Sequence, residues 1–222
     1  MSTTTTPFKD PIVEALRQYT TCDVADALVK LGIPDGGFLP GITMWSPQRQ
    51  DGDTKIVGPA YTVVYAPHDD PRPKWPSHYI DAVPAGAVVF VTSAGGSASN
   101  ALYGGLMSTR AKASGAVGSV INGRFRDLQE QRELGYPIFA RDVGTAPPGP
   151  VLKVVDVNSA PIEGLCSIEI APGDYVIGDV NGVVVLPRAL AEKALPLMEK
   201  QVEADSKMAA EIAKGMSFAE AT

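Results

Sequence analysis

The chain has 222 residues, of which 45% are hydrophobic and 20% are charged, and a chain of this size and composition can bury a sizeable core within one domain. Its 19 Lys and Arg residues are outnumbered by 25 Asp and Glu residues and are scattered along the sequence. Because they form no basic patch, we do not expect the protein to bind nucleic acid. No apolar run approaches the length of a membrane-spanning helix. We therefore expect a cytoplasmic protein with no membrane partner.

The first nine residues differ in character from the rest. Residues 1–9 are rich in Thr, lack the basic and apolar regions of a signal peptide, and are predicted to form a disordered leader. Residues 10–222 are predicted to form one domain that begins with two short helices, over 11–19 and 22–31. Thr21 or Asp23 is predicted to cap the second helix. A contact with the active site of a neighbouring subunit is the alternative role for both residues.

Two apolar, β-branched stretches follow, over 55–65 and 87–92, and both predict strands. The second leads into a segment rich in Gly and Ser, after which a helix is predicted from near Gly104 to Gly115. Small residues let a ligand approach the backbone, and free N–H groups at a helix start form an anion site. The amides of Gly105, Leu106 and Met107 are therefore candidate donors to a substrate carboxylate or enolate oxygen. A tight turn with close helix packing is the alternative reading.

A third apolar stretch, over 116–121, predicts a buried strand that ends at Asn122-Gly123, a strong turn signal. Helix formers then run from Arg126 to Leu134. Asp127 is thus expected in the first turn of a helix that starts just past a strand end.

The start of this helix carries the candidate catalytic groups. Asp127 and Glu130 are three positions apart, so both carboxylates fall on one face of the predicted helix. Mg²⁺ and Mn²⁺ prefer oxygen ligands and often take only one or two protein carboxylates. Arg126 adds a planar guanidinium suited to a substrate carboxylate. The alternative is that Asp127 caps the helix while Arg126 and Glu130 are solvated surface groups.

The second half of the chain is rich in strands and ends in a long amphipathic helix, predicted over 188–213. The alternation of β and α elements implies a layered α/β fold. The predicted strands of this half cover residues 138–141, 151–157, 167–170, 175–178 and 183–186.

Other catalytic arrangements find little support. Lys153 lies in a predicted strand and is expected to face solvent rather than to form a Schiff base. His68 and His78 do not match the spacing of a zinc-binding helix and are interpreted as loop residues, with a contact to substrate as the alternative role. Cys22 and Cys166 form no CxxC pair and are expected to be reduced and buried.

The spacing Gly105-x20-Arg126-Asp127-x2-Glu130, together with its flanking residues, resembles the RraA-like family. That family includes the 4-hydroxy-4-methyl-2-oxoglutarate and 4-carboxy-4-hydroxy-2-oxoadipate aldolases. The resemblance spans roughly residues 10 to 215 and extends to four further segments: Thr21–Leu28, 58–62, 137–141 and 178–187.

The resemblance implies a layered α/β/α single domain of the swivelling β/β/α type. It also implies a class II pyruvate aldolase that uses Mg²⁺ or Mn²⁺, held mainly through Asp127 and waters. Arg126 and the amides of Gly105 to Met107 would bind the pyruvyl end of a 2-oxo acid. Oxaloacetate decarboxylation is implied too, because it passes through the same enolate.

The resemblance further implies homotrimers or homohexamers with active sites at subunit interfaces, which Glu203 of the long C-terminal helix would reach from a neighbouring subunit. The chain departs from the aldolase branch in two places. It has Gly104-Gly105-Leu106 where some aldolases carry an acidic residue, and the segment 67–78 is rich in proline and holds both histidines. Two alternatives follow, namely a lyase recruited to a specialised substrate and a non-catalytic regulator that binds a ribonuclease. The retained pair Arg126-Asp127 favours the enzyme.

Overall fold

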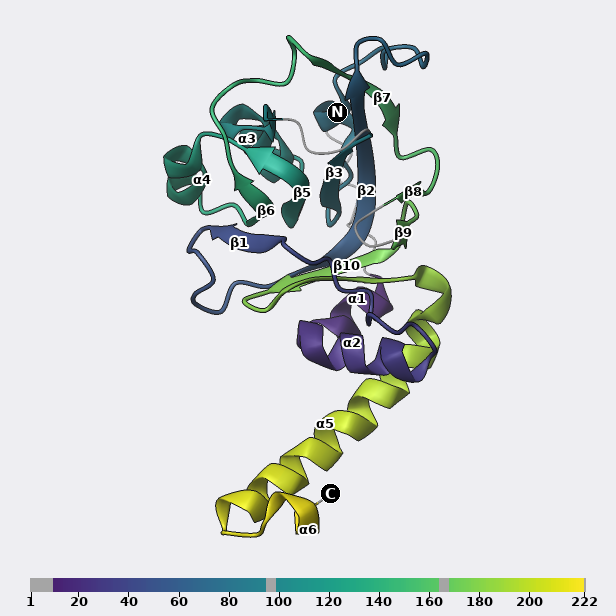
Figure 1. The fold of residues 1–222 in the computed structure, drawn as a ribbon, viewed down its shortest axis with the longest axis vertical. Coiled ribbons are helices and arrows are strands. Elements are labelled where there is room, and N and C mark those ends of the chain that lie inside the picture. Colours follow the sequence, from purple (N-terminus) through teal and green to yellow (C-terminus); the bar gives the residue numbers. More distant parts are fainter. Residues whose placement is uncertain (1–9, 95–98, 164–167, 222) are drawn as a thin grey trace, which may run out of the picture.

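The fold is that of a computed structural model, which describes residues 10–94, 99–163 and 168–221. The predicted leader over 1–9 and Cys166 lie outside these residues. Figure 1 shows a β-sheet body with helices on its two sides and one long helix that leaves it. The helices are α1 (Pro11–Leu16), α2 (Thr21–Lys30), α3 (Gly105–Ala113), α4 (Leu128–Leu134), α5 (Ala191–Ala213) and α6 (Phe218–Ala221), with 3-10 turns η1 (Tyr79–Ala82) and η2 (Arg188–Leu190).

A nine-stranded sheet forms the body, in the order β1-β6-β5-β3-β2-β10-β11, with β4 added beside β5 and β7 beside β2. Its strands are β1 (Thr43–Ser46), β2 (Ile56–Pro67), β3 (Val88–Ser93), β4 (Ala101–Tyr103), β5 (Gly118–Phe125), β6 (Ile138–Val143), β7 (Leu152–Val157), β10 (Tyr175–Asp179) and β11 (Gly182–Leu186). A separate pair joins β8 (Ile162–Glu163) to β9 (Glu169–Ile170). The predicted strands thus form, that over 167–170 only as the short β9, whereas β1, β4 and β8 were not predicted.

The sheet curls into a nearly closed barrel because the two ends of its long central strand, β2, pair with different strands. One end of β2 pairs with β10, and the other end pairs with β3 and β7. The segment before β1 returns to the far edge, where Leu39 donates its N–H to the carbonyl of Val183 at 2.9 Å. The predicted mixed α/β single domain is confirmed.

The site is positioned by the parallel part of the sheet. Strands β2, β3, β5 and β6 run parallel, with η1, α3 and α4 in the crossovers between them. Apolar side chains fill both faces of these strands, as parallel sheets covered by helices require. Strand β4 also runs parallel to β5, so the segments that follow β4 and β5 meet at the carboxyl edge of the sheet, where ligands of open α/β sheets bind.

The predicted turn at Asn122-Gly123 is wrong, because both residues lie inside β5. Asn122 is held there by its side chain, whose Nδ2 donates to Thr92 Oγ1 at 3.0 Å and whose Oδ1 accepts from Arg141 Nε at 2.7 Å. Pairing with β4 and β6 then carries the strand on to Phe125. Arg126 consequently follows the strand end directly.

The cap of α2 also differs from the prediction. Thr20 is the N-cap, and its side chain and that of Asp23 form a capping box. Thr21 instead bonds across the fold, since its N–H and its hydroxyl each donate to the Asp179 carboxylate at 2.8 Å. Cys22, expected to be buried, is exposed on this helix.

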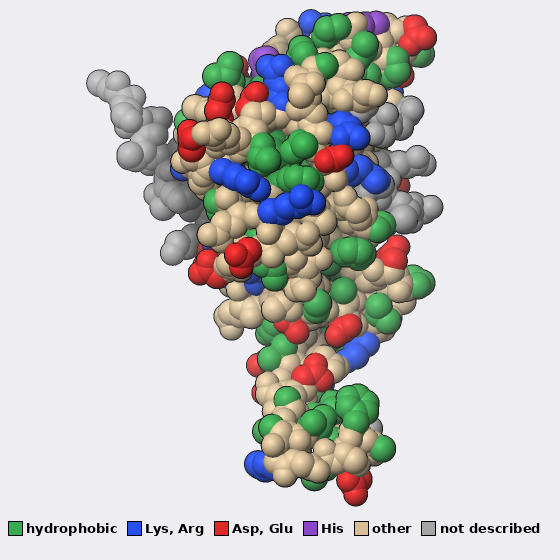
Figure 2. Space-filling model, turned by 60° about the vertical axis from the view of Figure 1, so that its left-hand side comes forward, with side chains coloured by type: hydrophobic (Ala, Val, Ile, Leu, Met, Phe, Trp, Pro, Cys, Tyr) green, Lys and Arg blue, Asp and Glu red, His purple; other side chains and the backbone are tan. Residues whose placement is uncertain are grey.

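The C-terminal helix α5 projects from the body (Figure 1). Its first turns pack Ala191, Ala194 and Met198 against α1, α2 and strands β10 and β11. Glu203 lies beyond that contact and is exposed. At the tip, Ile212, Met216 and Phe218 are exposed hydrophobic residues, and Figure 2 shows apolar side chains on this end. None of the helices in the described part of the chain is long and apolar enough to cross a membrane.

Gly58→Ala is expected to destabilise the protein without touching the candidate site. A Cβ at Gly58 would stand 2.2 Å from the carbonyl oxygen of Gly86 and 3.2 Å from Val117 Cγ2, and a backbone atom cannot move aside cheaply. We expect a loss of about 1–3 kcal/mol in the free energy of unfolding, measured by urea denaturation. Gly149→Ala is the control, because a Cβ there meets nothing within 4 Å; equal stability of the two variants would contradict the packing argument.

Candidate active site

A cavity of about 240 Å³ opens at the sheet edge where these segments meet. It contains every predicted site residue except Glu130. Its lining comes from the end of β2, the residue before η1, β4, the start of α3, the β5–α4 junction and the segment before β7: Tyr65, His78, Ala101–Tyr103, 104–107, Arg126, Asp127, Pro147 and Pro148. A cavity of this size suits a small metabolite, since drug-sized ligands need roughly 300–1,000 Å³.

Asp127 adopts a conformation that a structural helix cap does not need. It stands at the N-cap position of α4 with φ 64° and ψ 41°, in the left-handed region, and its side chain caps no amide of α4. The prediction that it lies in the first helical turn is therefore wrong, as is the alternative that it caps the helix. Its Oδ2 instead accepts the N–H of Gly105 at the start of α3, at 2.8 Å. Non-glycine residues in this region are uncommon and cluster at functional sites.

The backbone of Arg126 is fixed by a hydrogen bond, whereas its guanidinium group is only partly engaged. Its N–H donates to the carbonyl of Tyr103 at 2.9 Å, which ties the end of β5 to β4. Its Nε lies 3.5 Å from Asp127 Oδ2, and its Nη1 lies 3.5 Å from the carbonyl of Thr145. Within the described residues Nη2 has no acceptor. The side chain is 39% exposed, so the guanidinium can receive an anion from the cavity.

Glu130 joins this group at Gly105. A Cβ on Gly105 would lie 2.3 Å from Glu130 Oε2 and 3.4 Å from Asp127 Cβ. Both acidic side chains therefore lie against the Cα of Gly105, and glycine is the residue that leaves them this room. The sequence predicted that the two carboxylates share one face of a helix; both do lie beside Gly105, but Asp127 stands outside α4 in the left-handed region.

Of the three amides predicted to bind substrate, two already donate hydrogen bonds within the protein. The amide of Gly105 is taken by Asp127, and that of Met107 donates to the carbonyl of Gly104 at 3.1 Å. The amide of Leu106 has no acceptor among the described residues. The substrate-binding roles of these three residues stay a prediction, with Leu106 as the donor that the fold leaves available.

The carboxylate oxygens at this place suit a small, hard cation as ligands. Asp127 Oδ1 and the Glu130 carboxylate carry no hydrogen bond within the described residues, whereas Asp127 Oδ2 is already used. No group of three or more His, Cys, Asp and Glu residues among those described is arranged to hold a metal ion. Two carboxylates completed by waters and substrate oxygens suit Mg²⁺ or Mn²⁺ and do not suit a closed zinc site.

Several lining residues were not predicted. Burial raises the pKa of Tyr103 to about 12, and burial also raises the pKa of Tyr65, so both hydroxyls stay protonated at neutral pH. His78, interpreted from the sequence as a plain loop residue, lines the cavity with its ring stacked on Tyr79 at 5.5 Å. The proline-rich segment before it was the available signal. Lys153, expected to face solvent, is half-buried and donates to the carbonyl of Asp70 at 2.7 Å.

The chain matches relatives along most of its length. A relative from Halalkalibacterium halodurans that bears the name "Putative 4-hydroxy-4-methyl-2-oxoglutarate aldolase" is 30% identical over 183 residues, which cover 82% of this chain and 79% of that protein. "Protein DlpA" from Legionella pneumophila is 29% identical over 183 residues, 80% of this chain. The chain spans only 28% of the length of DlpA.

Solved structures share the fold. An uncharacterized protein from Pseudomonas syringae superposes with a TM-score of 0.81 at 29% identity, covering 98% of this chain and 99% of the other. Streptomyces coelicolor RraAS2, described as an unusual member of the RNase ES inhibitor RraA protein family, superposes with a TM-score of 0.74 at 24% identity, covering 96% and 100%. The RraA-like (Aldolase/RraA) family model matches residues 21–185, and the chain belongs to this family.

Proposed function

We propose that the chain is a lyase that depends on a divalent metal ion and cleaves 4-hydroxy-2-oxo dicarboxylates to release pyruvate, with oxaloacetate decarboxylation as a second activity. The observation that carries the proposal is the left-handed Asp127, whose carboxylate turns away from its own helix to lie beside Arg126 at the cavity. A structural N-cap would have extended backbone and would bond amides of its own helix. The aldolase name of the relative from H. halodurans supports the same class of reaction.

Mg²⁺ or Mn²⁺ is the proposed cofactor. Asp127 would hold it, with Glu130 contributing directly or through a water. When bound, such an ion supplies a Lewis acid that stabilises negative charge on the oxygen of a 2-oxo group.

Arg126 is assigned to the pyruvyl carboxylate. Its Nη2 and the amide of Leu106, neither of which has an acceptor among the described residues, provide N–H donors on the cavity wall. Bidentate guanidinium–carboxylate contacts fix orientation as well as add binding energy. Donors aimed at the oxygens where charge grows stabilise the transition state more than the bound substrate, which is what accelerates the reaction.

The bonds that change are the same for both substrates. In 4-hydroxy-4-methyl-2-oxoglutarate the C3–C4 bond breaks, the 4-hydroxyl loses its proton and becomes the carbonyl of one pyruvate, and C3 is then protonated to give the second. In oxaloacetate the C3–C4 bond breaks with loss of CO₂, and C3 is protonated in the same way. The hydroxyls of Tyr65 and Tyr103 are neutral and add no negative charge to the cavity wall. The guanidinium of Arg126 therefore keeps its positive charge available for a substrate anion.

We also propose a homotrimer or homohexamer. Helix α5 points away from the side of the body that carries α3 (Figure 1), so Glu203 can approach a cavity only in a neighbouring copy. The exposed Ile212, Met216 and Phe218 at its end support burial against a partner. Light scattering coupled to size exclusion measures the assembly, and a monomer at micromolar concentration would contradict it.

Gly104→Ala is expected to lower activity by roughly 10-fold to 100-fold, because small displacements of catalytic groups are costly. A Cβ there would lie 2.8 Å from Asp127 Oδ2 and 3.3 Å from Arg126 Nε, although the extended backbone of Gly104 accepts alanine without strain. Steady-state kinetics and thermal unfolding give the readout, with Gly149→Ala as control. Unchanged kcat/KM in Gly104→Ala would show that these two side chains need no fixed position.

Pyruvate release tests the proposed function. We expect release from oxaloacetate and from 4-hydroxy-4-methyl-2-oxoglutarate in the presence of Mg²⁺ or Mn²⁺, its loss with a chelator, and its recovery when metal is added back. Release from neither acid at any metal concentration would overturn the proposal. That result would leave a specialised substrate, or a regulator that binds a ribonuclease, as the remaining functions to assay.

A further inference from the structure

The cavity offers two side chains with N–H donors, Arg126 and His78, among the described residues that line it. The proposed function uses Arg126 at the pyruvyl end of the substrate. A dicarboxylate brings a second carboxylate into the same cavity of about 240 Å³. A buried or half-buried carboxylate needs a donor of its own, because leaving it unpaired costs binding energy. His78 has at least one ring N–H in either neutral form.

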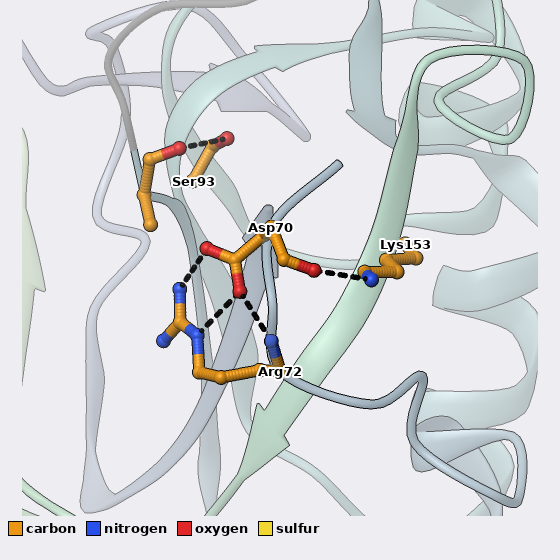
Figure 3. Close-up of polar contacts among 5 residues, drawn as sticks. Asp70, Arg72, Ser93 and Lys153 are labelled. Atoms are coloured by element: carbon orange, nitrogen blue, oxygen red, sulfur yellow. Dashed lines mark hydrogen bonds and ion pairs between the residues drawn. The ribbon is translucent and has the colours of Figure 1, made fainter. Parts of the chain in front are cut away.

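His78 is held by the segment before it, residues 67–77, which is fastened to β7 (Figure 3). Lys153 Nζ donates to the carbonyl of Asp70 at 2.7 Å, and the N–H of Trp75 donates to the carbonyl of Val154 at 2.8 Å. Asp70 in turn accepts two side-chain hydrogen bonds from Arg72, each at 2.9 Å. These Arg72 hydrogen bonds hold the pKa of Asp70 at about 2, so the carboxylate that organises the segment stays ionised at any ordinary pH.

The residues after His78 are fixed as well. The carbonyl of Tyr79 accepts the hydroxyl of Tyr61 at 3.0 Å inside the core. Asp81 pairs with Arg110 at 2.7 Å, which ties η1 to α3, the helix whose start lines the cavity. The His78 ring is stacked on Tyr79 with an angle of 24° between the ring planes. The His78 ring is thus held in place by its fixed neighbours in the chain and by stacking on Tyr79. It therefore has little conformational entropy left to lose when a ligand binds.

We propose that His78 recognises the distal carboxylate of the substrate and so makes the site selective for 2-oxo dicarboxylates over 2-oxo monocarboxylates. The inference rests on the proposed function for the placement of the pyruvyl end at Arg126. It assigns a role to the segment that holds both histidines of the chain. His68, the other one, lies outside the cavity, with its Nε2 2.9 Å from the carbonyl oxygen of Gly149.

The test compares two acids that cannot undergo aldol cleavage. 2-Oxoglutarate carries both carboxylates, whereas 2-oxopentanoate has the same pyruvyl end and a methyl group in place of the distal carboxylate. Their dissociation constants are measured by calorimetry in the presence of Mg²⁺ for wild type, His78→Ala, His78→Gln and His68→Ala. The last variant is the matched control from the same segment.

We expect His78→Ala to weaken 2-oxoglutarate binding by about 10-fold, the effect of one hydrogen bond to a charged group, and to leave 2-oxopentanoate binding within about twofold. His78→Gln, whose amide still donates, is expected to recover part of the preference, and His68→Ala to keep all of it. Equal effects of His78→Ala on the two acids, or the same loss in His68→Ala, would overturn the assignment to the His78 ring. Failure of wild type to bind either acid would instead overturn the proposed function itself.

Discussion

Asp127→Asn is expected to reduce pyruvate release by about 10²–10³-fold, the range seen when one electrostatic group is removed from a catalytic site. Asparagine matches aspartate in size and tolerates the left-handed backbone that Asp127 adopts. Its amide oxygen can still accept the Gly105 N–H, now at 2.8 Å from Oδ2. The substitution therefore removes the charge and the metal ligand while it preserves the local fold.

Stability distinguishes this role from a structural one. Loss of a negative charge at the start of α3 costs about 0.3–1 kcal/mol through the helix dipole, so the unfolding curve of Asp127→Asn is expected to move little. Asp26→Asn, at an exposed position of α2, serves as the control for a generic loss of charge. Full activity in Asp127→Asn together with a large loss of stability would show that Asp127 is only a structural residue.

Arg126→Lys is expected to raise KM for 2-oxo acids by roughly 10-fold to 100-fold, since a hydrogen bond to a charged group contributes about 1.5–3 kcal/mol. Lysine keeps the positive charge but replaces the planar fork by a point charge, and it cannot hold a carboxylate in two directions at once. The 3.5 Å contact from Arg126 Nε to Asp127 is lost as well. Steady-state kinetics with oxaloacetate at saturating Mg²⁺ gives the measurement.

Arg17→Lys is the matched control for this prediction. Arg17 is an exposed arginine whose Nε lies 3.7 Å from Glu14 Oε1, away from the cavity. We expect its KM to equal that of wild type. A wild-type KM in Arg126→Lys would mean that net charge alone, without guanidinium geometry, binds the substrate.

The order of the elements was predictable because its signals are local and strong. Long β-branched runs such as β3 and β5 alternate with helix formers bounded by Gly and Pro, and this alternation gives a layered α/β fold. The position of Arg126 and Asp127 just after a strand end followed from the same pattern. Asp127 and Glu130 both lie beside Gly105, but the shared helix face from which their proximity was predicted is absent, because Asp127 stands outside α4.

What failed depended on contacts between distant parts of the chain. Asn122-Gly123 has turn chemistry, but bonds to Thr92 and Arg141 hold it inside β5. Asp127 looked like a helical residue, and its left-handed backbone arises where β5, tied to β4 by the Arg126 N–H, turns sharply into α4.

The remaining misses have the same cause. The proline-rich sequence over 67–78 marked an unusual segment, but the place of His78 at the cavity depends on contacts with β7 and α3. Thr21 bonds to Asp179, a partner 158 positions along the chain. In each case a tertiary contact overrides a preference worth about 1 kcal/mol.

A Mn²⁺ titration followed by electron paramagnetic resonance tests the central claim most directly, because the sharp signal of the free hydrated ion disappears when the ion binds. We expect saturable binding of one ion per chain to the wild-type protein and the loss of that binding in Asp127→Asn, with Asp26→Asn unchanged. Equal Mn²⁺ affinity in wild type and Asp127→Asn would contradict the assignment of Asp127 as the metal ligand.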